Sequence, residues 1–178
     1  MADEPTTLAA LIEAQAKVLG EKPFLHFEDR VVSFAELNRQ VNRAANGLTG
    51  LGVKAGVGVS IMMPNSPEWL FVYSATQKLG ACAVPVNVGL KGEGLRHVID
   101  HSDSSILVCH PEYVGAIQAI SGELPKLQHI VVNATEVPDD WKPPEGWRRL
   151  AQVMEASDAN PGVEIDEDAI SALMYTSG

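Results

Sequence analysis

The chain contains 178 residues and carries a formal net charge of -10 at pH 7, because 23 acidic residues outnumber 13 Lys and Arg residues. Its length favours one domain, and 46% hydrophobic with 20% charged residues is the balance of a folded globular protein, not of a disordered chain. An acidic surface repels polyanions, so we expect no nucleic-acid partner.

The cysteines and the first residues indicate the compartment. Cys82 and Cys109 are the two cysteines of the sequence, and they form neither a C-x-x-C pair nor a zinc-ligand spacing, which indicates a reducing compartment. The opening Met-Ala-Asp-Glu-Pro lacks the basic and apolar regions of a secretory signal. No apolar run approaches the roughly 20 residues of a membrane span. We therefore expect a cytoplasmic protein without a transmembrane segment.

Helical and strand-like patterns alternate along the chain. The first part predicts a helix capped by Thr6 or Thr7 and ended by Gly20, a hairpin of strands 24–28 and 31–33 that turns at Asp29-Arg30, a helix from Ser33 to about Gly50, a strand over 57–63 and a helix from Ser66 to Gly80. The remainder predicts a strand over 82–86, a helix over 93–102, a strand over 105–109, a helix from Pro111 through Ile120, a strand over 129–132, a loop over 133–147, a short helix over 150–154 and a last strand over 170–175.

Strands of four to seven apolar residues between helices predict an α/β fold with a mostly parallel sheet flanked by helices. Ligands of such sheets lie beyond the carboxyl ends of the strands, which singles out residues 64–66 and 176–178. The last strand, expected to be buried, runs into Thr176, Ser177 and Gly178. Small hydroxyls and a glycine suit a phosphate cradle, although these residues alone are more typical of an ordinary strand-to-turn exit.

Four segments in this order resemble the adenylate-forming (AMP-binding) superfamily. They are residues 32–37 (Val-Ser-Phe-Ala-Glu-Leu), 63–68 (Met-Pro-Asn-Ser-Pro-Glu), 79–87 (Leu-Gly-Ala-Cys-Ala-Val-Pro-Val-Asn) and 175–178 (Tyr-Thr-Ser-Gly). The resemblance extends from about Leu8 to Gly178, and it is greatest to fatty-acyl and carnitine-type CoA ligases. One departure is Gly56-Val57-Gly58-Val59, where members of the family often carry Gly-Asp-x-Val.

The resemblance implies an acid-thiol ligase that activates a carboxylic acid with ATP and Mg²⁺ and passes the acyl group to coenzyme A. It implies that Thr176, Ser177 and Gly178 contact the phosphates of ATP, and that Tyr175 ends the strand supporting them. The remainder of the large domain and the C-terminal domain with its catalytic lysine follow Gly178 in this family. We therefore expect residues 1–178 to be a truncated N-terminal portion of the AMP-binding domain, with no catalytic residue and no metal ligand of its own.

Two alternatives remain, an adenylation domain that loads a carrier-protein thiol and a non-catalytic α/β module that binds a nucleotide or a partner. The sequence does not identify the carboxylic acid. The chain alone is expected to be inactive, and the exposed edges of a truncated sheet favour self-association.

Several other residues have an ordinary structural explanation. His97 and His101 have the spacing of two metal ligands on a helix, but a solvated helix face is the favoured interpretation, as it is for Asp100 and Asp103 nearby. Helix capping accounts for Ser33, Glu36 and Ser66, and turn chemistry for Asn65. We expect Trp69, Tyr73, Cys82 and Cys109 to belong to the core.

Overall fold

A parallel sheet forms the centre of the computed structural model, which describes residues 5–135, 137–138 and 140–176. Within these residues the sheet has five strands in the order β4-β3-β5-β6-β7. Their bounds are Gly58–Met62 for β3, Cys82–Pro85 for β4, Ser104–Cys109 for β5, His129–Val132 for β6 and Arg148–Arg149 for β7. All four pairings are parallel, so the predicted α/β fold with a parallel sheet is confirmed.

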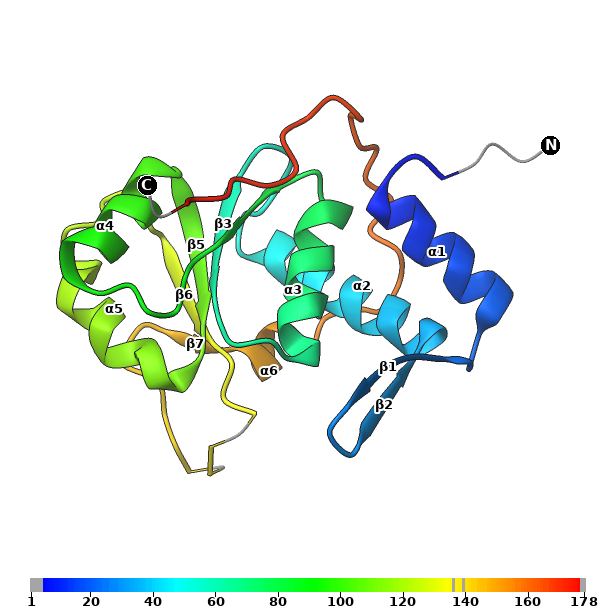
Figure 1. Cartoon of the computed structure of the whole chain (residues 1–178), viewed down its shortest axis with the longest axis horizontal. Helices are drawn as coiled ribbons and strands as arrows, with labels where there is room; N and C mark the ends of the chain where they lie inside the picture. Colours follow the sequence, from blue (N-terminus) through cyan, green and yellow to red (C-terminus); the bar gives the residue numbers. More distant parts are fainter. Residues whose placement is uncertain (1–4, 136, 139, 177–178) are drawn as a thin grey trace.

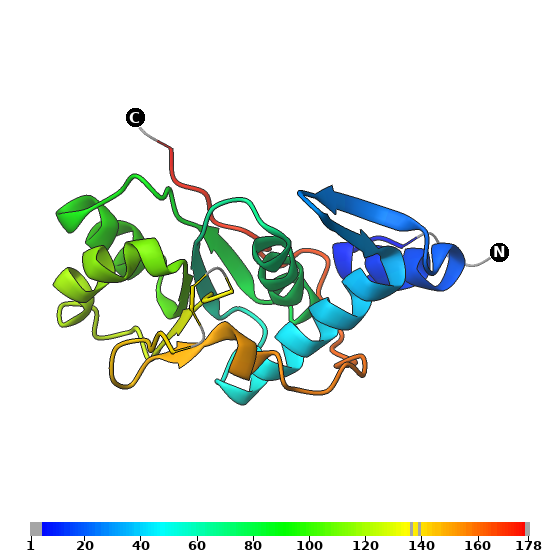
Figure 2. The same cartoon turned by 90° about the horizontal axis from the view of Figure 1, so that it is seen from below.

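Helices cover both faces of the sheet (Figure 1). Their bounds are Leu8–Leu19 for α1, Phe34–Gly50 for α2, Pro67–Lys78 for α3, Gly92–His101 for α4, Val114–Ser121 for α5 and Leu150–Val153 for α6. The helices α4 and α5 lie on one face, and α2 and α3 lie on the other, with α1 packed against both of them. Figure 2 shows the hairpin of β1 (Pro23–Phe27) and β2 (Arg30–Ser33) beside α1, at the end of the molecule opposite α4 and α5. In the described part of the chain, every helix is too short or too polar to cross a bilayer.

Alternation of side chains along the central strands divides the apolar core into two clusters. In one cluster, four strand side chains pack with residues of α2 and α3; they are Val59, Ile61, Ile106 and Val108. In the other cluster, the strand side chains Met62, Leu107 and Cys109 pack with residues of α4 and α5. Because both faces are covered, β3 is buried along its whole length, as is typical of a central strand in a parallel sheet.

The predicted helix starts are confirmed by their caps. The hydroxyls of Thr7, Ser33 and Ser66 each accept a hydrogen bond from a backbone N–H of the first turn, at 3.1–3.2 Å. The reciprocal half of the predicted Ser33–Glu36 capping box is wrong. The carboxylate of Glu36 instead accepts hydrogen bonds from Gln40 Nε2 at 2.6 Å and Arg39 Nε at 2.9 Å.

The hairpin turns one residue earlier than predicted, because Phe27 pairs with Arg30 and leaves Glu28 and Asp29 as the turn. Glu28 has a φ of 50°, the left-handed conformation that two-residue hairpin turns require. The helix expected from Pro111 starts as a 3-10 turn, Pro111–Tyr113, before α5 begins.

The predicted last strand over 170–175 is wrong. In the part of the chain that the structure describes, this segment forms one isolated parallel bridge, between Ala83 of β4 and Ala172. Its two hydrogen bonds run from Ala83 N to Ser171 O at 3.0 Å and from Leu173 N to Ala83 O at 2.9 Å. The segment is also not buried as expected, since Ile170 and Met174 are 70% and 71% exposed.

Proline chemistry explains why this ladder stops. On the outer edge of β4, the next rung would need a backbone N–H from Pro85, which has none. The preceding rung would need the N–H of Ala81, which donates to Thr76 O at 2.9 Å at the end of α3. Ala83 is therefore the one residue of β4 whose N–H is available to extend the sheet outward.

A buried lysine joins the three helices on the side of α1, and the sequence analysis missed it. Lys78 is 2% exposed, and its ammonium nitrogen lies 2.6 Å from Asn42 Oδ1, 2.8 Å from Asn38 Oδ1 and 3.1 Å from Glu13 Oε1. Burial lowers the pKa of Lys78, and its hydrogen bond to Glu13 opposes that effect. One cation thus links α3 to α2 and α1 through three oxygen acceptors.

We expect Lys78→Met to lower the free energy of unfolding by about 2–4 kcal/mol, because it keeps most of the volume but leaves three acceptors without their cation. Urea unfolding of the chain measures this change. Lys17→Met is the matched control, since Lys17 lies exposed on α1 and its replacement should cost less than about 0.5 kcal/mol. Equal losses in both variants would show that the buried contacts of Lys78 contribute nothing.

Candidate functional site

Polar side chains follow four neighbouring strands at the edge of the sheet where the strands end. Asn87, Asn65, His110 and Asn133 come after β4, β3, β5 and β6, in the spatial order of the strands. Carboxyl ends of parallel strands share one edge, and this edge is where α/β proteins bind their ligands. The predicted segment 64–66 therefore lies at the expected place.

The ends of β3 and β4 and the segment before Thr176 surround an open hollow of about 490 Å³. Asn65 comes from the end of β3, Asn87 from the end of β4, and Tyr175 from the other side of the hollow. Thr176 follows directly and is exposed. Of the predicted phosphate-binding residues, Ser177 and Gly178 lie outside the described residues. Thr176 thus offers an exposed hydroxyl directly after a residue that lines the hollow, and a hydroxyl is a suitable hydrogen-bond donor to a phosphate group.

The chain reaches this edge by an irregular segment with local turns, residues 157–176, which we call the strap. After α6 it passes over α2 and continues past α3 to the outer side of β4 (Figure 1). On α2, Asn46 Nδ2 donates to the carbonyl oxygens of Ser157 and Ala159 at 2.7 and 2.8 Å, and Asn42 Nδ2 donates to that of Asp158 at 2.8 Å. Side-chain amides of α2 therefore hold the start of the strap.

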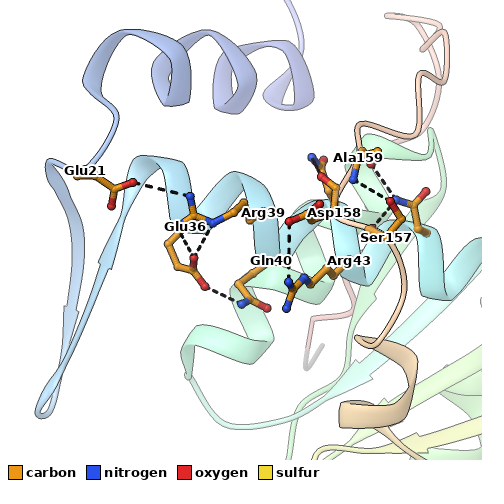
Figure 3. Close-up of polar contacts among 10 residues, drawn as sticks. Glu21, Glu36, Arg39, Gln40, Arg43, Ser157, Asp158 and Ala159 are labelled. Atoms are coloured by element: carbon orange, nitrogen blue, oxygen red, sulfur yellow. Dashed lines mark hydrogen bonds and ion pairs between the residues drawn. The ribbon is translucent and has the colours of Figure 1, made fainter.

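An ion-paired surface on α2 surrounds this attachment. Figure 3 shows Arg43 directed at the carboxylate of Asp158, which lies 3.8 Å from its Nη2 atom. One turn earlier, Arg39 pairs with Glu36 at 2.7 Å and lies 3.7 Å from Glu21. These groups are exposed, so each pair adds little to stability, and the amide contacts specify where the strap lies.

The end of the strap is held by α3 and α4. Gln77 Nε2 of α3 donates to the carbonyl oxygen of Ser171 at 2.8 Å. The hydroxyl of Tyr175 lies 2.8 Å from Nδ1 of His101, the last residue of α4, and the two rings meet edge to face at 5.8 Å. Burial, and then the nearby carboxylate of Asp103, raise the pKa of Tyr175. The raised pKa keeps the phenol protonated at neutral pH, so its hydroxyl can donate a hydrogen bond to Nδ1 of His101.

The structure gives His101 a partner that the sequence analysis did not foresee. Its ring lies 5.2 Å from that of His97, but the described residues contain no group of three or more His, Cys, Asp or Glu that could hold a metal ion. Asp103 forms an ion pair with Lys126 on the surface, in agreement with its interpretation as a surface charge. Because 74 residues separate His101 from Tyr175, no local pattern in the sequence indicates this contact.

The remaining candidates occupy structural positions. Trp69 and Tyr73 stack at 5.0 Å with an angle of 9° between their rings, partly buried against the core. Cys109 is fully buried, which raises the pKa of its thiol to about 12, so it behaves as the small apolar residue that was predicted. Cys82 is half-buried, and burial raises its pKa as well.

Comparison with known proteins identifies the family. Residues 12–178 match the sequence model described as AMP-binding enzyme. The chain belongs to this family. The predicted resemblance to adenylate-forming enzymes is thereby confirmed.

Several members of the family are similar to this chain in sequence or in structure. The crotonobetaine/carnitine–CoA ligase of Salmonella paratyphi A is 31% identical over 173 residues, which cover 92% of this chain and 32% of that enzyme. A solved anthranilate CoA ligase in complex with anthranoyl-AMP superposes with a TM-score of 0.89 at 29% identity, over 99% of this chain and 34% of that one. A fatty acyl CoA synthetase of Mycobacterium tuberculosis gives a TM-score of 0.79 at 26% identity, over 97% and 33%. The chain therefore spans about a third of the length of these relatives.

Proposed function

We propose that residues 1–178 form the N-terminal portion of the adenylation domain of an ATP-dependent acyl-CoA ligase, in which Thr176, Ser177 and Gly178 bind the phosphates of ATP. The proposal rests on where the end of the strap lies in space, just before Thr176, in a chain that belongs to the AMP-binding family. The strap runs along the outer side of β4, and Tyr175, the residue before Thr176, lines the hollow at the ends of β3 and β4.

The proposed reaction has two steps. An oxygen of the substrate carboxylate attacks the α-phosphorus of ATP, the bond from that phosphorus to the bridging oxygen breaks, and pyrophosphate leaves. The thiol of coenzyme A then attacks the acyl carbon of the acyl-adenylate and releases AMP. In the first step, Thr176 and the residues after it hold the departing phosphates with hydroxyl and amide donors, so that the developing negative charge is stabilised.

Mg²⁺ would neutralise charge on the phosphates when bound. The described residues hold no cluster of three or more acidic, His or Cys groups, so the proposal assigns the magnesium ligands to the part of the longer relatives that this chain does not span. In this chain, the exposed hydroxyl of Thr176 is the described group that the proposal assigns to the phosphates.

The named relatives act on different acids, since their names specify crotonobetaine or carnitine, anthranilate and fatty acyl groups. The proposal accordingly specifies a carboxylic acid, and a fatty or carnitine-type acid is its finer form. Because these relatives are named as CoA ligases or synthetases, coenzyme A is favoured over the thiol of a carrier protein as acyl acceptor. A non-catalytic binding module is the remaining alternative.

Acid-dependent release of pyrophosphate tests whether the chain is active by itself. We expect none above background from purified residues 1–178 with ATP, Mg²⁺ and a panel of fatty and aromatic acids. One preorganised donor at a charged transition state is worth about 3 kcal/mol, and the longer relatives supply several more groups than this chain contains. A positive control is a longer ligase that carries the chain. Release by the chain alone would contradict the proposed division of the domain.

We expect Thr176→Ala in that longer ligase to slow adenylate formation by about 10- to 150-fold, because one charge-assisted hydrogen bond to phosphate contributes about 1.5–3 kcal/mol. Transfer to coenzyme A from preformed acyl-adenylate should stay unchanged, since pyrophosphate has already left. Rapid-quench measurement of each half-reaction separates the two steps, and Thr176→Ser, which keeps the hydroxyl, is the matched control. Equal slowing of both half-reactions would show that Thr176 does not act on the departing phosphates.

A further inference from the structure

Polar contacts and partial apolar packing, of Leu173 and Tyr175 against the cluster that includes α4, together hold the end of the strap. Ile170 and Met174 expose most of their surface, and within the described residues the sheet reaches the strap through Ala83. Since Pro85 cannot donate the next hydrogen bond, the sheet does not direct the strap beyond Leu173. A contact beyond Leu173 is therefore needed to hold the direction in which the chain arrives at Thr176.

The hydrogen bond between Tyr175 and His101 is that contact. It joins the residue immediately before Thr176 to the last residue of α4, at 2.8 Å. The helix α4 is a rigid support, because Leu95, Val98 and Ile99 anchor it in the core. Tyr175 also packs against the same apolar cluster as α4. One residue before the proposed phosphate-binding site, the strap is thus attached to the core of the fold.

We propose that His101 is a positioning residue for the phosphate-binding loop: through the hydroxyl of Tyr175 it fixes the direction in which the strap presents Thr176. The inference rests on the proposed function. Because Thr176 follows Tyr175 directly, attaching Tyr175 to α4 restricts where Thr176 can lie. Gln77 supplies a second attachment four residues earlier, at the carbonyl oxygen of Ser171. These two attachments restrict the position of the residues between them.

Adenylate formation by the longer ligase tests this role. We expect His101→Ala to raise the KM for ATP or to slow adenylate formation by about 3- to 10-fold, the effect of one lost hydrogen bond, with transfer from preformed acyl-adenylate unchanged. His101→Asn places an amide oxygen where Nδ1 lies and should restore the rate to within about 2-fold. His97→Ala, one turn earlier on the same helix face, is the matched control and should leave both half-reactions unchanged.

A double-mutant cycle distinguishes positioning from general destabilisation. Tyr175→Phe should cause the same loss as His101→Ala, and the double variant should be no slower than either single one, since both remove the same hydrogen bond. Additive losses, or equal losses in the two half-reactions, would overturn the positioning role.

Amide hydrogen exchange in residues 1–178 provides a readout that needs no nucleotide. The N–H of Leu173 donates to Ala83 O at 2.9 Å, and we expect it to exchange about 3- to 10-fold faster in His101→Ala and Tyr175→Phe, while the amides of β3 keep their rates. Unchanged exchange at Leu173 would overturn the proposal whatever the ligase does. Faster exchange with unaltered adenylate formation would overturn the role toward the phosphates. A wild-type longer ligase that forms no adenylate would instead overturn the proposed function, and the role of His101 toward the phosphates with it.

Discussion

The central strand β3 is the constraint on which the rest of the structure depends. All five of its residues are buried, and it pairs with β4 on one side and β5 on the other. Its alternating side chains reach both apolar clusters, so the helices on each face pack against the same strand. Because its neighbours are parallel, the chain leaves each strand at one common edge, and the polar residues that follow these strands gather there.

Regular strand pairing ends at the outer side of β4, yet the strap beside it is still held in place. Pro85 and the occupied N–H of Ala81 limit pairing to Ala83, and side chains from α2, α3 and α4 then hold the strap. A segment held in this way leaves Thr176 exposed, and a phosphate-binding loop must be open to its ligand. In a fully paired strand buried under a helix, that hydroxyl would be covered. The limited pairing is thus compatible with the function proposed for the family motif.

Much of the fold could be predicted because its signals are local. The helix starts at Thr7, Ser33 and Ser66 depend on residues three positions apart, and each cap is present. The last strand was mispredicted because an apolar run such as 170–175 has the same pattern whether it forms a buried strand or lies beside the edge of a sheet. The limit that Pro85 sets on pairing becomes visible only when the strands that flank β4 are known. The contacts of Lys78 and of Tyr175 with His101 join residues 36 to 74 positions apart, so periodicity does not reveal them. The candidate phosphate site came from resemblance to a family, since the tetrapeptide 175–178 alone is typical of an ordinary strand-to-turn exit.

A crystal structure of the longer ligase with a non-hydrolysable ATP analogue, Mg²⁺ and a carboxylic acid tests the account most directly. We expect the triphosphate at the carboxyl edge of the sheet, with a phosphate oxygen within about 3 Å of the Thr176 hydroxyl. The hydrogen bond between Tyr175 and His101 should be retained in that complex. A triphosphate bound elsewhere, with Thr176 directed into solvent or the strap detached from α4, would contradict the account.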